Sequence, residues 1–405
     1  MAHIYDTKNK RLMIDTTTAL ELVLLHGSVN TNVLEVDLKD GLDYVLAQDV
    51  ISEIDMPPFR QSAMDGYALH MGDDATYTLV GEVKAGDNNN PTLQKGKAVR
   101  IFTGAPVPIT ANTVVMQEKV TVEGTKITIE EPLKENTNIR PQGEQIKLGG
   151  VAINKGTTIK GVHIGFLASL GVTKITVCKK PSIAIIVTGN ELKSAGTKLS
   201  YGEIYESNGA MLTAVLNELG YQNTSVITIK DDYGKTKKVL NDTIGKHDLV
   251  IVTGGVSVGD YDFVGKAFDE IGVEQVFYKV KQKPGKPLYF GKKEGASIFG
   301  LPGNPAAALS CFYIYVYPLL KKYEGAEHTS LPSISLPLLS DYSVKGTQAQ
   351  FLKARIEAAG VTILGGQGSA MVRAFGDANA LVCLPVNSTE IKKGQIVKTI
   401  LLPFK

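Results

Sequence analysis

Apolar and polar positions between residues 179 and 325 alternate as they do when strands and helices follow one another along a chain. Short apolar runs rich in β-branched residues predict strands at 183–187, 225–229, 249–252 and 275–280. Apolar residues at helical spacing predict helices at 207–219, 234–244 and 262–271. This order predicts a doubly wound α/β sheet, and right-handed crossovers place the carboxyl ends of its strands along one edge.

The chain before this sheet shows two different patterns. Residues 15–50 and 162–170 carry apolar side chains at helical spacing, and Asp15 or Thr16 can cap the first helix. The stretch between them reads as short strands, and VTVEGTKITI at 120–129 predicts a hairpin. We therefore expect a helical domain that is split in sequence by an inserted β domain.

The last part of the chain is rich in strand patterns. The runs SISLPLL, AQFLKARIEA and ALVCLPV are separated by turn residues, which predicts a small β-barrel or sandwich. The fold class is thus a multidomain chain of α/β and β parts. The predicted domains are a split helical domain, an inserted β domain, an α/β domain and a C-terminal β-barrel, at 1–50 with 142–178, 51–141, 179–328 and 329–405.

Composition narrows the class of protein. The chain has 405 residues, too many for a single core, and its net charge of +2 gives no overall field that favours nucleic acid. Cys178, Cys311 and Cys383 form no close pair, and the six histidines show no zinc-binding spacing. The amino terminus lacks the apolar core of a signal peptide. These features predict a soluble cytoplasmic protein with neither a membrane nor a nucleic-acid partner.

Residues that bind metals and anions follow each predicted strand. They are Glu191 in TGNEL, Asp231 after the second strand, Asp260 and Asp262 in TGGVSVGDYDF, and Lys283 and Lys286 in KQKPGKP. Carboxylates are ligands that Mg²⁺ prefers, whereas lysines and the N–H groups of glycine turns bind phosphate or another tetrahedral oxyanion. Each motif alone also fits an ordinary solvated turn. Their meeting at one edge favours a phosphate and metal site.

Two further stretches carry candidate ligand residues. In FGLPGNPAAAL, Pro305 suits the first turn of a helix and leaves Gly303 and Asn304 at its positive end. In the last domain, polar side chains on a β face are able to point at an anion, or simply at solvent. These side chains are Lys353, Arg355, Ser369 and Arg373.

Seven motifs in the chain together resemble those of one enzyme family. In order they are MPPFRQSAMDGYA, RIFTGAPVP, TGNEL, GEIYESNGAML, TGGVSVGDYDF, KPGKP and GLPGNPAAAL. This set resembles the molybdopterin molybdenumtransferases, which include bacterial MoeA and the E domains of gephyrin and plant Cnx. The resemblance implies an elongated homodimer of four-domain subunits, with a MogA-like α/β domain. It also implies insertion of molybdate into adenylylated molybdopterin, with Mg²⁺-dependent hydrolysis that releases AMP and gives molybdenum cofactor.

The resemblance also assigns roles to individual positions. It implies catalytic roles for Glu191, Asp231, Asp262, Lys283 and Lys286. It implies that Glu191, Asp260 and Asp262 bind the metal. Together with the glycine loops and the last domain, it implies a substrate-binding set of Thr103, Thr188, Gly189, Gly254, Gly255, Ser257, Gly259, Gly303, Asn304, Lys353, Arg355 and Ser369.

Several positions depart from the family pattern. Arg60, Asn190 and Gln145 stand where relatives often carry an acid, and Lys353 stands where an arginine is usual. Two other functions therefore stay open: adenylylation of molybdopterin, and a non-catalytic scaffold that binds the pterin. The expected protein partners are the molybdopterin adenylyltransferase and apo-molybdoenzymes.

Overall fold

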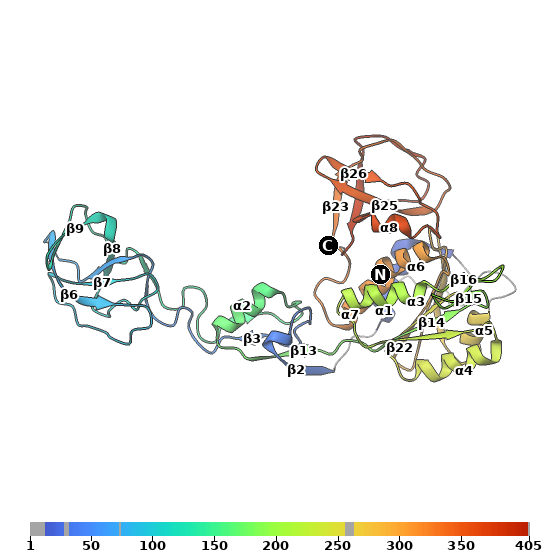
Figure 1. Ribbon diagram of the computed structural model, residues 1–405, viewed down its shortest axis with the longest axis horizontal. Helices are drawn as coiled ribbons and strands as arrows, with labels where there is room; N and C mark the ends of the chain where they lie inside the picture. The colour runs from blue at the N-terminus through green and yellow to red at the C-terminus, as the bar shows by residue number, and fades with distance from the viewer. Residues whose placement is uncertain (1–12, 28–31, 73, 256–262, 404–405) are drawn as a thin grey trace, which may run out of the picture.

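The protein is elongated, with its parts arranged in a row (Figure 1). This computed structural model describes residues 13–27, 32–72, 74–255 and 263–403. A β domain forms one end, a small unit around helix α2 (Gly161–Ser169) lies in the middle, and the larger remainder carries both termini. Within the part described, no helix is long and apolar enough to span a bilayer.

A seven-stranded mixed sheet is the centre of the larger part. Its order is β1-β19-β21-β22-β18-β14-β17. The bounds are β1 (Met13–Ile14), β19 (Glu274–Val280), β21 (Pro287–Lys293), β22 (Ala296–Leu301), β18 (Leu249–Thr253), β14 (Ile183–Thr188) and β17 (Thr224–Ile229). All run parallel except β21, so the four predicted strands do end along one edge.

Helices cover both faces of this sheet, as the doubly wound prediction requires. One face carries α1 (Thr16–His26), α3 (Asn208–Glu218), α6 (Pro305–Cys311) and α7 (Tyr317–Tyr323), and the other carries α4 (Tyr233–Ile244) and α5 (Phe263–Glu270). Strand β14 shows why, because Ile183, Ile185 and Val187 enter one core while Ala184 and Ile186 enter the other. The alternation of buried side chains along a strand produces this division.

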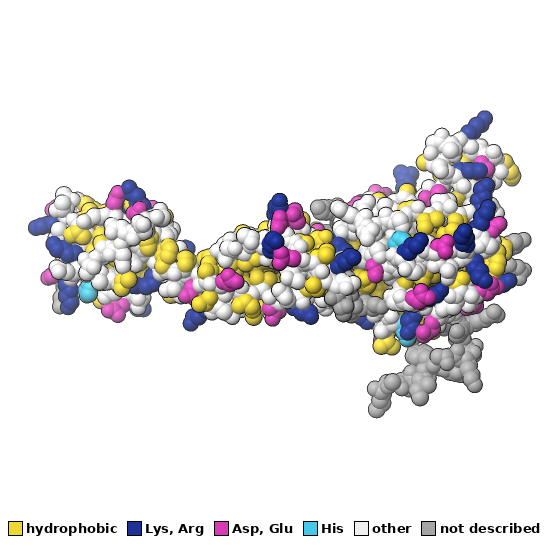
Figure 2. All heavy atoms as spheres, turned by 90° about the horizontal axis from the view of Figure 1, so that it is seen from below, with side chains coloured by type: hydrophobic (Ala, Val, Ile, Leu, Met, Phe, Trp, Pro, Cys, Tyr) yellow, Lys and Arg dark blue, Asp and Glu magenta, His cyan; other side chains and the backbone are white. Residues whose placement is uncertain are grey.

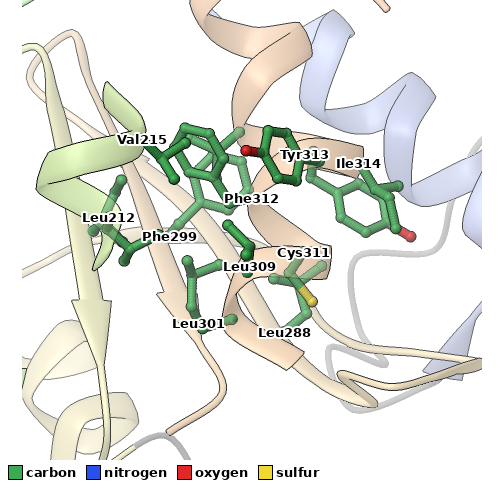
Figure 3. Packing of buried hydrophobic residues seen from close by; sticks show 14 of the residues in the cluster. Leu212, Val215, Leu288, Phe299, Leu301, Leu309, Cys311, Phe312, Tyr313 and Ile314 are labelled. Carbon is green, nitrogen blue, oxygen red and sulfur yellow. The ribbon is translucent and has the colours of Figure 1, made fainter. Parts of the chain in front are cut away.

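The larger core lies beneath α3 and α6. Figure 3 shows Phe299 and Leu301 of β22 packed against Leu309 and Phe312, with Leu212 of α3 closing the cluster. A π-helical turn over Phe312–Val316 links α6 to α7 and is buried throughout. Burial of several aromatic side chains in one cluster fixes how α6 sits on the sheet.

Three strands of the sheet were not predicted, namely β1, β21 and β22. β21 and β22 form an antiparallel hairpin after the lysine-rich turn at 281–286. This segment was expected only as a polar stretch after the strand at 275–280, and no strand was predicted over 287–301. A strand can contain proline here because Pro287 is the first residue of β21.

The helical prediction for residues 15–50 is largely wrong. Among the described residues of this range, α1 is the only α-helix, with Asp15 as its N-cap, and Leu38–Asp40 form one 3-10 turn. In contrast, β2 (Val33–Asp37) and β3 (Val50–Ile51) are strands. These strands pair with β13 (Lys174–Cys178) and β12 (Val151–Ile153). In VLEVD, apolar and polar residues alternate with the period of a strand, and this pattern describes the segment better than the helical spacing does. Moreover, β1 and α1 join the seven-stranded sheet and its core, although the split domain was predicted to include them.

The inserted β segment forms a six-stranded sheet of order β8-β5-β7-β6-β10-β9. Its strands are β5 (Gly66–Leu69), β6 (Thr76–Val83), β7 (Lys97–Ile101), β8 (Thr113–Met116), β9 (Val120–Glu123) and β10 (Lys126–Ile129). The predicted hairpin is confirmed, because Glu123 pairs with Lys126 across a turn in which Gly124 has a φ of 60°. Short pairs of β4 (Gln61–Ser62) with β11 (Ile139–Arg140) connect this sheet to the middle unit.

The C-terminal part is a sheet that borrows one strand from the α/β region. Its order is β20-β25-β27-β29-β23, with β26 beside β25. The bounds are β20 (Gln282–Lys283), β23 (Ser333–Pro337), β25 (Ala349–Glu357), β26 (Gly360–Ile363), β27 (Ala380–Leu384) and β29 (Ile396–Leu401). A closed barrel stays a prediction, as do the limits of the four domains.

Truncation of a core aromatic tests this packing. Phe299 is fully buried and its ring centroid lies 4.8 Å from that of Phe290. We expect Phe299→Ala to lower the free energy of unfolding by about 3–5 kcal/mol, measured by urea titration of circular dichroism. Tyr201→Ala is the matched control, because Tyr201 is fully exposed, and a change there above about 0.5 kcal/mol contradicts the assignment.

Candidate active site

The carboxyl edge of the seven-stranded sheet holds a cleft of about 620 Å³. Its walls come from the ends of β14, β17, β18 and β22 and from the start of α3, so distant segments of the chain meet there. The predicted residues that line it are Thr188, Gly189, Glu191, Asp231, Gly254, Gly255, Gly303 and Asn304. The structure therefore brings together most of the candidates taken from the strand ends.

Two glycines allow the loop after β18 to pack directly on the end of β14. Gly254 has a φ of 86°, and a Cβ there would lie 2.2 Å from the carbonyl oxygen of Thr188. A Cβ on Gly255 would lie 2.7 Å from Thr188 Oγ1. No residue other than glycine fits without moving backbone. The loop can thus bring its own N–H groups close to a ligand.

Asn208, at the start of α3, ties two of the converging loops together. Its Nδ2 donates to Thr253 Oγ1 at 2.7 Å and to the carbonyl oxygen of Gly303 at 2.8 Å. Both hydrogens of the amide are then used, and Asn208 Oδ1 is left buried without a partner among the described residues, as is Thr188 Oγ1. An unpaired buried oxygen costs about 1–3 kcal/mol. Such a cost is typical of functional sites.

Asn190 and Asp231 join the ends of β14 and β17. The Asn190 N–H donates to Asp231 Oδ2 at 3.2 Å, and the Asp231 N–H donates to Asn190 Oδ1 at 3.1 Å. An aspartate at 190 would place a second carboxylate beside Asp231, whereas the amide accepts the same bond without charge. This departure from the family pattern therefore has a local structural reason.

Among the described residues that line the cleft, the side chains that carry charge at neutral pH are all acidic. They are Glu191, Glu206 and Asp231. Glu206 Oε1 also accepts from the Gly209 N–H at 2.7 Å, which holds it at the start of α3. A phosphate group entering such a cleft meets like charge unless a cation accompanies it.

Some candidate metal ligands of this cleft belong to the described part of the chain, and others lie outside it. Within the ranges that the structure describes, no three His, Cys, Asp or Glu side chains gather closely enough to hold an ion. The predicted metal ligands Asp260 and Asp262, and the predicted loop residues Ser257 and Gly259, lie outside the described residues. The donor chemistry still suits Mg²⁺, because the cleft offers carboxylates and two unpaired buried oxygens.

The C-terminal part completes one wall of the cleft. Asn304 Nδ2 donates to Ser369 Oγ at 2.9 Å, and the Ala307 N–H donates to the carbonyl oxygen of Ser369 at 3.0 Å. The next residue, Ala370, lines the cleft. Ser369 thus lies in a turn beside the cleft, not on the β face that was expected, and it couples the last domain to α6.

Lys353 stabilises the loop around Ser369 and does not point into the cleft. Its side chain is buried, with 3% of the residue exposed, and Nζ donates to the carbonyl oxygens of Gly368 and Met371. Burial lowers the pKa of Lys353. Arg355 is engaged elsewhere, since its Nε donates to the carbonyl oxygen of Asp377 at 3.1 Å. Neither side chain lines the cleft, contrary to the expectation that both face the substrate.

Lys283 ends β20, and Lys286 lies in the turn that joins β20 to β21. Both are exposed, and Lys286 precedes Pro287, which lines the cleft. Gln282 fixes the turn from inside, because its Nε2 donates to the carbonyl oxygen of Gly285 at 3.1 Å. The two lysines therefore flank the cleft without lining it.

Thr103 is held in a different place. Its N–H and Oγ1 both donate to Asp65 Oδ1, at 2.7 and 2.8 Å, and these bonds lower the pKa of Asp65. Both residues belong to the inserted β domain, which lies at the end of the molecule opposite the cleft (Figure 1). Arg60 also has a local role there, donating to the carbonyl oxygen of Ala111 at 2.8 Å. Within one chain, Thr103 does not reach the cleft.

Sequence reasoning selected no residue from GEIYESNGAML, yet this motif supplies a whole wall. Ile204, Tyr205, Glu206 and Asn208 all line the cleft. The motif was noticed only as part of a resemblance. The pattern that indicates a functional wall here is an acid, Glu206, followed by Ser207 and Asn208, residue types that favour helix N-termini, and then by an apolar helical run.

Comparisons with known proteins cover almost the whole chain. Residues 14–171 match the family of the MoeA N-terminal region (domain I and II), 184–322 match a probable molybdopterin binding domain, and 335–402 match the MoeA C-terminal region (domain IV). Proteins named molybdopterin molybdenumtransferase from Staphylococcus epidermidis and Staphylococcus aureus are 33% identical over 404 residues, covering 97% of this chain and 96% of theirs.

A solved structure shares the architecture. The crystal structure of a molybdopterin biosynthesis MoeA protein from Pyrococcus horikoshii OT3 superposes with a TM-score of 0.85 at 28% identity. It covers 96% of this chain and all of that one.

Substitution of Gly254 tests the close approach at the cleft. We expect Gly254→Ala to lower the free energy of unfolding by more than about 3 kcal/mol, because left-handed strain of about 1–2 kcal/mol adds to a backbone clash. Gly272→Ala is the matched control, since Gly272 has a φ of 78° but open space around it. Thermal denaturation measures both, and equal losses would show that the clash is absent.

Proposed function

This chain belongs to the MoeA family of molybdopterin molybdenumtransferases, and from that premise we propose that it inserts molybdate into adenylylated molybdopterin. The products are molybdenum cofactor and AMP. The observation that carries the proposal is the cleft in which Glu191, Asp231 and the Gly254–Gly255 turn meet. Open α/β sheets bind their ligands at such an edge.

The residues of the cleft divide the work between them. The glycine turn offers N–H groups to phosphate oxygens, and Glu191 orients the water that attacks the adenylyl phosphorus. The P–O bond to the pterin phosphate then breaks and AMP leaves. The two dithiolene sulfurs replace two oxygens of molybdate, which depart as water once protonated.

A divalent cation would offset the repulsion between the acidic side chains of the cleft and an anionic substrate. We propose that Glu191 holds Mg²⁺ together with Asp260 and Asp262, and that Asp231 fixes the neighbouring turn. When bound, Mg²⁺ neutralises phosphate charge and polarises the bond that is cleaved. Glu191 is exposed at the cleft, so its carboxylate is available without rearrangement of the core.

Molybdate is an oxyanion and needs positive charge. Lys283 and Lys286 are exposed beside the cleft, with Ser369 on the opposite rim as a hydroxyl donor. We propose that the two lysines bind molybdate or the phosphate, while Lys353 shapes the loop that carries Ser369. Point charges on flexible stems suit an oxyanion that must enter and leave.

We also propose that the active form is a homodimer. Large apolar side chains are exposed along the middle unit and its junction with the inserted domain, where Figure 2 shows yellow patches. They are Leu34, Leu42, Ile51, Ile54, Phe59, Met64, Leu148, Val151 and Val162. Exposed apolar surface of this extent marks an interaction site. A second subunit would supply the Asp65 and Thr103 cluster that one chain keeps away from its own cleft.

The alternatives fit less well. An adenylyltransferase needs only the α/β region, whereas this chain also matches the N- and C-terminal regions of MoeA. A non-catalytic scaffold has no need for Glu191 and Asp231 in one cleft. Consistent with the proposed reaction, we expect a cytoplasmic location and transient contacts with the adenylyltransferase that supplies the substrate and with apo-molybdoenzymes that receive the product.

Reconstitution tests the proposed reaction. Purified chain, adenylylated molybdopterin, molybdate and Mg²⁺ are incubated without oxygen, and AMP is measured together with cofactor transferred to an apo-enzyme. We expect both products to require molybdate, and Glu191→Gln to slow them by about tenfold or more, with excess Mg²⁺ giving partial recovery. Glu123→Gln, the same change at an exposed position on β9, serves as the control. Pterin binding without either product contradicts the proposal.

Mixed subunits test whether the inserted domain acts across a dimer. Thr103→Ala and Glu191→Ala chains are each expected to be inactive alone. When the two are unfolded together and refolded, half of the dimers are mixed and each has one intact shared site. Activity should then return to about a quarter of the wild-type level if the interface is two-fold. No recovery, in a preparation shown to be dimeric by light scattering, would argue that each cleft is complete within one chain.

A further inference from the structure

One wall of the cleft is apolar and open to solvent. β15 (Leu192–Lys193) pairs in parallel with β16 (Ile204–Tyr205), and Leu192, Ile204 and Tyr205 all line the cleft. Ile204 is 54% exposed and Tyr205 is 45% exposed. Where the lining of the same cleft is described, the side chains that carry charge at neutral pH are acidic. The side chains of Tyr205 and Ile204 are therefore not part of a hydrophobic core.

The orientation of Tyr205 is fixed by its own hydroxyl. Tyr205 Oη donates to the carbonyl oxygen of Thr197 at 2.7 Å, so the ring is held at both ends. An ion pair of 3.0 Å between Lys193 and Glu203 ties the two arms of the same segment. A ring that is restrained before binding loses little conformational freedom when a ligand covers it.

The wall is also coupled to the proposed reaction centre. The Ile204 N–H donates to the carbonyl oxygen of Glu191 at 2.9 Å, and the Glu206 N–H donates to that of Lys193 at 2.9 Å. The aromatic wall and the two acids Glu191 and Glu206 therefore belong to one backbone ladder. A ligand that binds against Tyr205 would therefore lie in the same cleft as Glu191 and Glu206.

We infer that the ring of Tyr205 is the surface on which a heteroaromatic ring of the substrate stacks. The inference rests on the proposed function, which supplies two such rings, the adenine of the adenylyl group and the pterin. Both are flat, conjugated and carry a polar edge, so both match an apolar face at the mouth of a polar cleft. Stacking on an aromatic side chain holds the ring and thereby sets the distance from the phosphates to Glu191.

Ligand binding to the full chain tests this assignment. Calorimetric titrations in the presence of Mg²⁺ compare AMP, ribose 5-phosphate and 6-hydroxymethylpterin, so that one probe lacks any ring. Tyr205→Ala should weaken AMP or the pterin by about tenfold, the usual size of a lost base–aromatic stack, and leave ribose 5-phosphate unchanged. Tyr205→Phe keeps the ring and should stay within about threefold of the wild type.

The choice of probes separates the possible outcomes. A loss confined to AMP assigns the wall to adenine, and a loss confined to the pterin assigns it to that ring. Tyr201→Ala, an exposed tyrosine outside the cleft lining, controls for changes in the segment, and Ile204→Ala provides a second variant of the wall. Circular dichroism checks that each variant is folded.

Several results would overturn the inference. Equal weakening of AMP and ribose 5-phosphate by Tyr205→Ala means that Tyr205 only shapes the cleft. Unchanged affinity for both ring ligands, in a protein that still forms molybdenum cofactor, removes the stacking role and leaves the proposed function standing. If the wild type binds neither AMP nor the pterin, the inference and the proposed function fail together.

Discussion

The contact between the ends of β14 and β18 is the constraint on which the site depends. Only a residue without a Cβ allows the loop after β18 to lie against the carbonyl oxygen of Thr188. From that contact the remaining geometry follows, because Thr253, one residue earlier, accepts the hydrogen bond that Asn208 uses to bring α3 to the same edge. Asn208 in turn reaches Gly303 at the end of β22. Three loops are thus held by one glycine turn and one amide.

A second layer of structure serves the same edge from outside the sheet. Ser369 of the C-terminal part is bonded to Asn304, and the buried Lys353 secures the loop that presents Ser369. Strand β20 passes from the α/β region into the C-terminal sheet and carries Lys283 to the junction. The two regions are therefore interlocked at the cleft, while the inserted domain stands apart at the far end of the molecule (Figure 1). In the proposed homodimer, a second subunit would bring the Thr103 cluster to this edge.

The sequence allowed good prediction where one physical rule dominated. Apolar runs predicted four of the six parallel strands of this sheet, β14, β17, β18 and β19, but neither β1 nor the fully buried β22. The rule that parallel strands end at one edge predicted that Glu191, Asp231 and Gly254 lie close together, and all three line the cleft. Prediction failed where long-range pairing decided the outcome. Residues 33–37 and 50–51 pair with strands 100 or more positions away, and the helical spacing within 15–50 does not indicate this pairing. Lys353 was expected to face an anion because charge suggests exposure, yet its burial depends on two carbonyl groups that no pattern reveals. Asn208 and Tyr205 were passed over because their roles arise from partners on other loops.

The most direct test is a crystal structure of the full chain with AMP and Mg²⁺. We expect the nucleotide in the cleft, with its phosphate against the Gly254–Gly255 turn and Mg²⁺ within ligand distance of Glu191 at about 2.1 Å. A nucleotide bound in the inserted β domain, or in this cleft with its phosphate away from the glycine turn, would contradict the site described for this chain.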